Sequence, residues 1–488
     1  MLSIPRSPRQ QGQALPLTLI FLLVLCVGLM VTFNTGQVVN KKVELTNAAD
    51  AAAYSVAVEQ ARAWNLAAYM NRGRIANEVA VAQLVSLNSW MTQINVSAKM
   101  TETYSNILSA VPYVGFIFKA VAQIAKAADQ IMRPIRTGLR EASGPAIGLI
   151  DQVLNQSYAQ VAELAIEQAS TAGAMKVAHD VVDANSPNAK VTALSYANLV
   201  RQMEQARSEY LQQFNVPKGR SSGSVGGDRY RNLVMESRDK FTVDRRDDAK
   251  LFIIGFEANG GTDMVDYNRW SAVDTNNFVV DIWLLELDLP LGWAGAQAAP
   301  NRNKRFFAGM GNGRGWYSDY QRKRLKAYNG LSPWEMTSQM AESDPGGSMV
   351  GGKRNHAFFT QYKNGIAHQY HDVKDGKART PEDGPIFTVE VATSTKETRT
   401  SSNIGMATGR MDVPESPPGD KIKALSSAQI YFNRPHDYNG GRMFNRYVRG
   451  RSDARYEAGS LFSPYWQARL TETPATLRAS FNALSAAP

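Results

Sequence analysis

The chain has 488 residues, of which 44% are hydrophobic and 20% charged, and its formal net charge is +10 at pH 7. This length can hold two or three domains with real hydrophobic cores, and the mixture is that of an ordinary globular protein apart from one apolar segment. The single cysteine, Cys26, excludes an intramolecular disulfide and a thiolate metal site, and the even spread of the basic residues favours a solvated surface over a nucleic-acid site.

The first predicted element is a transmembrane helix over residues 14–36. No charged side chain occurs between Arg9 and Lys41, and thirteen Leu, Ile, Phe or Val residues lie between Leu15 and Phe33. A helix of this length reaches about 35 Å, which is enough for a hydrocarbon core about 30 Å thick. The pattern therefore predicts a single membrane anchor.

The leader at residues 1–13 sets the expected orientation. Arg6 and Arg9 should stay in the cytoplasm and leave the bulk of the chain outside it, although Lys41 and Lys42 on the far side weaken this bias. The alternative is a cleaved secretion signal, but no small-x-small cleavage site follows the apolar core. We therefore expect the anchor to be retained.

Residues 37–215 are rich in Ala, Gln, Glu, Asn and Leu, and their apolar residues recur at helical spacing. This section is expected to form a helical bundle or stalk of four or five helices. One buried face is predicted to run through Ile147, Ile150, Leu154, Tyr158, Val161 and Ala165. Helices are expected to break or kink at Gly73, the Val111–Gly115 turn, Pro134, Gly144-Pro145 and Asn185–Pro187.

A Gly- and Ser-rich linker is predicted at residues 216–227, followed by a mixed or mainly β head at 228–488, so that the fold class is α+β. In the strand at 386–392, Thr388 and Glu390 should face away from Phe387 and Val389, as in a half-buried antiparallel strand. A short helix is expected near the end, at 474–484. The other predicted strands are Leu251–Phe256, Phe278–Leu287, Phe358–Tyr362 and Ala428–Phe432.

The N-terminal region carries a specific order of parts. A basic leader is followed by Gly12-Gln13-Ala14, the apolar span, Phe33–Gln37 and the alanine-rich run Asn47–Tyr54. In this order, residues 11 to about 90 resemble the N-terminal region of TadG-like proteins, the Tad-domain family associated with Flp (tight-adherence) pilus assembly in bacteria. The resemblance implies a single-pass protein of the bacterial inner membrane, with protein partners in a pilus or related secretion assembly and no enzymatic activity.

Two features separate the chain from other members of such systems. Pilin-like subunits carry a Glu five residues after the processed Gly, whereas here that position is Leu17 and the first Glu after Gly12 is Glu44. The Asp-x-Ser-x-Ser triplet of the von Willebrand type A domain, which some TadG-like proteins carry, is absent from the sequence. A processed pseudopilin remains the less favoured alternative, and a tethered extracytoplasmic enzyme or glycan-binding head stays open.

The alanines at 48, 49, 51, 52 and 53 leave a thin helix that could pack closely against a neighbour, although high helix propensity alone would also explain them. We predict no catalytic residue, cofactor or metal. His368, His371 and Asp372 are a weak metal candidate, and Gly309–Gly315 lacks the residues of a phosphate loop. Asp247-Asp248 is an acidic pair with no predicted facing geometry.

The strongest candidate partner-binding patch lies in the head, where guanidinium groups suited to phosphate or carboxylate recognition alternate with aromatic rings. A solvated loop is the alternative interpretation. The predicted partner-binding residues are Arg442, Arg446, Arg449, Arg451 and Arg455, interleaved with Phe444, Tyr447 and Tyr456.

Overall fold

The computed structural model describes residues 14–168, 172–216, 229–243, 245, 247–282, 285–302, 356–366, 369–380, 382–400, 421–433 and 458–486. The chain forms two compact units, each assembled from separate segments. Unit 1 comprises residues 1–66, 164–212 and 373–488, and unit 2 comprises 67–163 and 213–372. The predicted boundary at 216–227, of which only Val216 is described, does not separate these units, because each takes segments from both sides of it.

The described residues confirm a mixed α+β fold, with a long apolar N-terminal helix and several antiparallel sheets. The helices are α1 (Ala14–Leu108), α2 (Gly115–Leu149), η1 (Ile150–Leu154), α3 (Asn155–Gln168), α4 (Ala172–Asn185), α5 (Ala193–Gln205), η2 (Ala206–Tyr210), α6 (Arg229–Glu236), α7 (Lys240–Val243), η3 (Thr395–Glu397) and α10 (Ala475–Ala486). The strands are β1 (Lys190–Val191), β2 (Leu211–Asn215), β3 (Asp247–Leu251), β4 (Ile254–Asp266), β5 (Arg269–Ile282), β6 (Leu285–Ala298), β7 (Ala357–Phe359), β8 (Gln369–Val373), β9 (Ile386–Ser394), β10 (Lys421–Phe432) and β11 (Trp466–Thr471).

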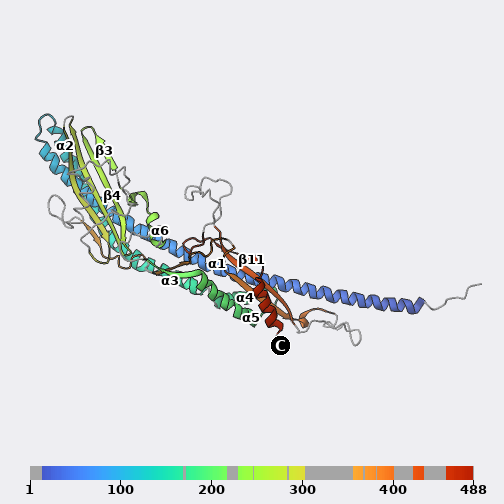
Figure 1. Cartoon of the computed structure of the whole chain (residues 1–488). Helices are drawn as coiled ribbons and strands as arrows, with labels where there is room; N and C mark the ends of the chain where they lie inside the picture. The colour runs from blue at the N-terminus through green and yellow to red at the C-terminus, as the bar shows by residue number, and fades with distance from the viewer. Residues whose placement is uncertain are drawn as a thin grey trace, which may run out of the picture. The chain divides into compact units, whose positions relative to one another are not determined.

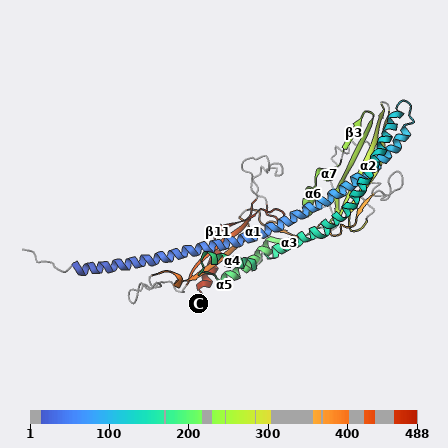
Figure 2. The same ribbon diagram turned by 180° about the vertical axis from the view of Figure 1, so that it is seen from behind.

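Helix α1 runs without interruption from the predicted anchor to Leu108, as Figures 1 and 2 show. The helix is therefore not interrupted at Gly73, where the sequence predicted a break or a kink. A Cβ at this position would lie 2.8 Å from the Tyr158 ring, so the glycine lets the ring approach the helix backbone. Helix α2 likewise continues through Pro134 and Pro145, whereas the turn before Gly115 and the end of α4 at Asn185 lie where the sequence predicted breaks.

Unit 1 is built on an antiparallel sheet with strand order β1-β9-β10-β11. The prediction of a half-buried strand at 386–392 is wrong for β9, because every residue from Phe387 to Val391 is buried. Helix α5 covers the side expected to be wet. Its Gln202 side chain bonds to the main chain and hydroxyl of Thr388, and the Ser195 hydroxyl accepts from the Glu390 main chain.

Unit 2 is built on a second sheet with strand order β3-β4-β5-β6-β7, in which β7 is parallel to β6 and the other pairs are antiparallel. Two of the predicted strands turn out to contain chain reversals. Leu251–Phe256 holds the turn between β3 and β4, and Phe278–Leu287 spans the end of β5 and the start of β6. The true strands are longer and more polar than the sequence suggested.

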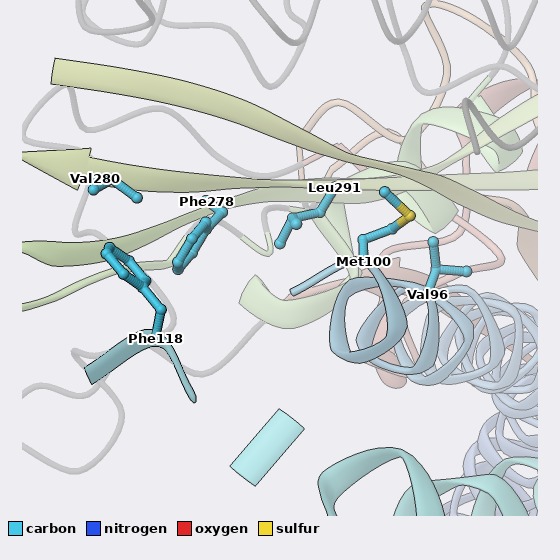
Figure 3. Packing of buried hydrophobic residues seen from close by; sticks show 6 residues of the cluster. All are labelled: Val96, Met100, Phe118, Phe278, Val280 and Leu291. Carbon is cyan, nitrogen blue, oxygen red and sulfur yellow. The ribbon is translucent and has the colours of Figure 1, made fainter. Parts of the chain in front are cut away.

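Helices α1 and α2 pack on one face of this sheet. Figure 3 shows Val96 and Met100 of α1 and Phe118 of α2 turned toward Phe278, Val280 and Leu291 of strands β5 and β6. All six side chains are buried. Fully burying a side chain of this kind contributes roughly 1.5 to 3 kcal/mol relative to leaving it exposed, so this cluster anchors the two helices to the sheet.

Candidate functional site

The N-terminal part of α1 is exposed on all sides as far as Leu29. Leu17 and Leu23 are 72% and 52% exposed, and the other Leu, Ile, Val and Phe side chains from Leu15 to Phe33 are exposed as well. The most apolar stretch has a mean hydropathy of 2.6 and none of it is buried. An all-round apolar helix long enough to cross a bilayer needs an apolar surrounding, so this helix could span a membrane.

Beyond this segment, α1 enters unit 1 through a small polar cluster. The Lys41 ammonium donates to Oε1 of Glu44 at 2.7 Å, and the Ser186 hydroxyl at the end of α4 donates to the same oxygen. Partial burial opposes ionisation of Glu44, but these hydrogen bonds and the Lys41 charge outweigh it and lower its pKa. The side chain of Lys42 bonds to the Lys423 carbonyl of β10. Both lysines are thus held within unit 1.

The alanine-rich face of α1 follows directly. Ala48, Ala49, Ala52 and Ala53 have no exposed surface. The close approach that these small side chains allow is therefore used inside this chain. Further along α1, the ring of Trp64 packs edge to face against the ring of Trp466, with 4.6 Å between the ring centroids.

Asn65 completes the attachment of α1 to β11. Its amide group donates to the Trp466 carbonyl and accepts from the Trp466 main-chain N–H, both at 2.9 Å. Leu461 and Phe462, which precede β11 in the chain, are also buried. The exposed apolar segment and the first packed stretch of unit 1 are thus parts of one helix.

In unit 2, α1 carries a buried carboxylate. Glu78 has no exposed surface, and its Oε2 accepts hydrogen bonds from the Tyr362 hydroxyl at 2.6 Å and the Trp270 indole at 3.1 Å. Its Oε1 accepts from the Asn155 amide at 2.8 Å. Burial raises the pKa of Glu78 to about 7; the two hydrogen bonds on Oε2 and the nearby Arg74 charge oppose this rise, and the Asp151 charge reinforces it.

Asp151, one helical turn before Asn155, forms the second half of this cluster. It lies in the π-helical turn η1 and accepts three main-chain N–H bonds from Lys363, Asn364 and Gly365, at 2.7 to 3.0 Å. Burial raises its pKa, and these three hydrogen bonds oppose the rise. The π turn places Asp151, rather than the predicted Ile150 or Leu154, on the buried face.

A second buried network crosses the strands. Arg245 and Asp274 form a two-point ion pair, with N–O distances of 2.6 and 3.1 Å and side chains 1% and 3% exposed. The same guanidinium donates to the Thr262 hydroxyl at 3.1 Å, which in turn bonds to Ser86 of α1 at 2.6 Å. The polar residues of β4 and β5 are therefore paired with a polar face of α1.

Unit 2 also contains an apolar cavity of about 410 Å³ between α1, α2 and the β3–β4 hairpin. Ala98, Ile124, Leu251 and Phe256 are among its lining residues, and Glu78 is not. The buried carboxylates and the cavity are thus separate features. The carboxylate clusters fix the packing of α1 on the sheet, and the cavity offers mainly apolar contact, with Thr101 and Lys250 also in its lining.

Most of the predicted site residues lie outside the described part of the chain. This holds for the five candidate partner-binding arginines, for Gly309–Gly315 and for His368. His371 is described and its Nδ1 lies 2.8 Å from the Glu163 carboxylate, while Asp372 accepts from Arg229 at 2.7 Å. Within the residues that the structure describes, no group of three or more His, Cys, Asp or Glu side chains is arranged to hold a metal.

The sequence analysis missed Glu78 and its partners. A signal was available on α1, where Asn71, Arg74, Glu78 and Ser86 recur at helical spacing on the face that also carries buried Ile75 and Ala82. Polar residues in phase with apolar ones indicate a buried polar face. The partners Trp270 and Tyr362 carry no comparable signal, because they come from distant segments.

The fold and the exposed N-terminal helix define a mixed α+β protein in which one helix of the described part of the chain could cross a membrane. Residues 12–62 match the family model Tad, described as Flp pilus-assembly TadE/G-like. The chain thus carries an N-terminal Tad domain, which indicates involvement in Flp pilus assembly together with protein partners. Comparison with the curated proteins and with the solved structures gave no match.

Proposed function

We propose that this protein is a membrane-anchored, non-enzymatic accessory protein that assembles or anchors a Tad/Flp-type pilus or a related surface secretion system. The anchor lies in the bacterial inner membrane, the leader at residues 1–13 is cytoplasmic, and the rest of the chain is extracytoplasmic. The observation that carries the proposal is the position of the Tad domain. It covers both the exposed apolar segment and the buried alanine face, which are joined in one unbroken helix.

This continuity supports an anchoring role. Lys41 is bonded to Glu44 and Ser186 within unit 1. If a signal sequence were cleaved beyond Lys41, the removed piece would therefore include part of the helix that packs in this unit. A helix that begins in lipid and ends in a packed unit holds that unit at the membrane surface.

Deletion and complementation in the bacterium that encodes the protein test the role. Loss of the gene should abolish or sharply reduce surface pili counted by electron microscopy, and the full chain should restore them. A form in which residues 1–36 are replaced by a cleaved secretion signal should be exported but should not restore pili. Normal pili in the deletion strain would exclude the assembly role, and full restoration by the released form would point to a secreted or enzymatic activity.

Single-cysteine labelling tests the topology. Cys26 is the only native cysteine, so a Cys26→Ser background accepts one probe at a time. In intact spheroplasts, a membrane-impermeant maleimide should label Ser157→Cys, whose site on α3 is exposed, and should label Ser7→Cys only after lysis. The reverse pattern would overturn the proposed orientation.

A further inference from the structure

Helix α2 has two opposite faces that are both apolar. Phe118, Ala122 and Ala125 lie on the face that packs into unit 2. On the other side, Phe116, Ile124 and Ile131 are 74%, 69% and 64% exposed, and Ile135 continues the same line. At about 100° per residue, the exposed residues fall within one sector of roughly 100°. An apolar stripe of this width is typical of a helix face that is covered by something.

The exposed stripe is flanked by basic residues. Lys119, Lys126 and Arg133 follow one another at seven-residue spacing along one side of it. Arg133 pairs with the buried Asp129, whereas Lys119 and Lys126 are exposed and have no ion pair among the described residues. Near the end of the stripe Arg136 and Arg140 lie close enough to repel one another. The flank is therefore positively charged and would be attracted to an anionic surface.

Two aromatic turns border the same region. Tyr113, between α1 and α2, is 97% exposed, and Phe252, between β3 and β4, is 90% exposed. Both have positive φ angles, 67° and 50°, a conformation that bulky residues rarely adopt. The two turns flank one core cluster, because Val114 and Ile254 pack against it together. Backbone strain of this kind clusters at binding and switch sites, which makes the two turns candidates for a contact with a partner surface.

We propose that the stripe on α2, with the two aromatic turns, docks on an anionic lipid bilayer. Apolar side chains on one face with lysines beside them are the features of helices that lie in a membrane interface. Aromatic rings at turn tips fit the headgroup level. A second copy of the chain is disfavoured as the occupant, because pairing the same surfaces would bring the basic flanks of both copies together.

The test uses the full chain with its anchor held in nanodiscs of neutral phosphatidylcholine. These are mixed with vesicles of phosphatidylcholine alone or of phosphatidylcholine containing phosphatidylglycerol, and binding is measured by co-flotation. The protein should bind the anionic vesicles, and added salt should weaken binding. Absence of binding to the anionic vesicles would overturn the proposal.

Matched variants locate the surface. The double change Lys119→Ser/Lys126→Ser should weaken binding about fivefold for each lysine, the factor that roughly 1 kcal/mol represents. Ile124→Ser/Ile131→Ser should weaken it at least as much. The control Lys176→Ser/Lys190→Ser removes the same charge from exposed sites in unit 1 and should have no effect. Equal binding by all three variants would place the lipid contact elsewhere.

A direct probe separates lipid from protein as the occupant. Ile131→Cys in the Cys26→Ser background, labelled with an environment-sensitive fluorophore, should shift its emission to the blue with anionic vesicles and remain unchanged with neutral ones. Light scattering without vesicles measures whether copies of the chain associate through the stripe. The labelled chain and the Ile124→Ser/Ile131→Ser variant should show the same degree of self-association. An unshifted probe would contradict lipid docking, and association that Ile124→Ser/Ile131→Ser abolishes would assign the stripe to another copy of the chain.

Discussion

The Tyr362 hydroxyl donates a 2.6 Å hydrogen bond to Glu78, which lies 284 positions earlier in the chain. Burial and the Glu78 charge raise the pKa of Tyr362 well above its ordinary value, so the phenol stays a donor. This bond ties helix α1 to the segment that follows β7. Glu78 is consequently a residue on which the packing of unit 2 depends, and its ionisation should be visible in stability.

Replacing Glu78 with Gln should change how stability depends on pH. Because burial raises the folded-state pKa of Glu78 to about 7 from 4.5, the folded state binds more protons than the unfolded state between these values. The stabilising contribution of protonated Glu78 is therefore fully present below pH 4.5 and is lost as the pH rises through 7. For one group whose pKa rises from 4.5 to about 7, the loss in the free energy of unfolding is about 3 kcal/mol. Relative to the wild type, Glu78→Gln should gain stability across this window.

Thermal unfolding of the detergent-solubilised chain, followed at several pH values across the window, measures this difference. The oxygen of the Gln side chain can still accept from Tyr362 and Trp270. Its NH2 group then needs an acceptor, which Asn155 supplies if the side-chain amides of Asn155 and Asn77, bonded to each other at 2.9 Å, both turn over so that O and N exchange places. If the unfolding midpoints of the wild type and of Glu78→Gln differed by the same amount at every pH, Glu78 would not titrate in this window.

The buried ion pair of Arg245 should be sensitive to the loss of one partner. Asp274→Asn leaves a guanidinium buried without its counter-charge, which costs about 3 to 5 kcal/mol. The control is Asp281→Asn, which breaks the exposed Lys250–Asp281 pair, whose side chains are 58% and 43% exposed. Such a surface pair contributes at most about 1 kcal/mol. Chemical denaturation that finds the two changes equally mild would contradict the packing described for β5.

The alanine face of α1 should reject larger side chains. Ala52 is fully buried, so Ala52→Leu overpacks unit 1 and should cost about 1 to 3 kcal/mol. Ala197→Leu, at an exposed position of α5 in the same unit, is the matched control and should be nearly neutral. If unfolding measurements found Ala52→Leu as harmless as the control, the alanine face could not be packed within unit 1. It would then have to be exposed, as a surface that binds another protein is.

The anchor should reject a charge at its centre. Leu23→Arg adds about 2.5 to 3.5 kcal/mol to the free energy of membrane insertion, which removes much of the gain of roughly 4 to 8 kcal/mol from the thirteen large apolar residues. Gln37→Arg, just beyond the segment, should insert normally. Alkaline extraction of membranes measures the inserted fraction, and unaltered recovery of Leu23→Arg in the pellet would contradict a spanning helix.

Parts of the fold with one dominant local signal could be predicted from the sequence. The apolar segment at 14–36, the strand at 386–392 and the final helix each carry their own period or composition. Helix α5 lies in the section at 37–215 that was predicted to be helical, and Thr192 at its start accepts from the Ser195 N–H as a helix cap. In these elements the side chains that decide the structure are near one another in sequence.

The rest depends on distant partners. Strands β4 and β5 contain Gly260, Asp274 and other residues that are depleted in strands, and the Asp274 carboxylate is satisfied there by Arg245. A Cβ at Gly260 would overlap the Asp274 carboxylate, so the glycine makes room for the ion pair. The Glu78 cluster is assembled from four segments in the same way, and no local pattern joins them.

The unbroken course of α1 has a mechanical consequence. A flexible linker between a membrane segment and a folded unit would let each turn independently, whereas a continuous helix is stiff to twisting. Any rotation of residues 14–36 about the helix axis is passed to Lys41, Glu44 and the alanine face, and hence to the part of unit 1 packed around them. Whatever turns the lipid-embedded segment within a larger assembly thereby turns this folded unit as well.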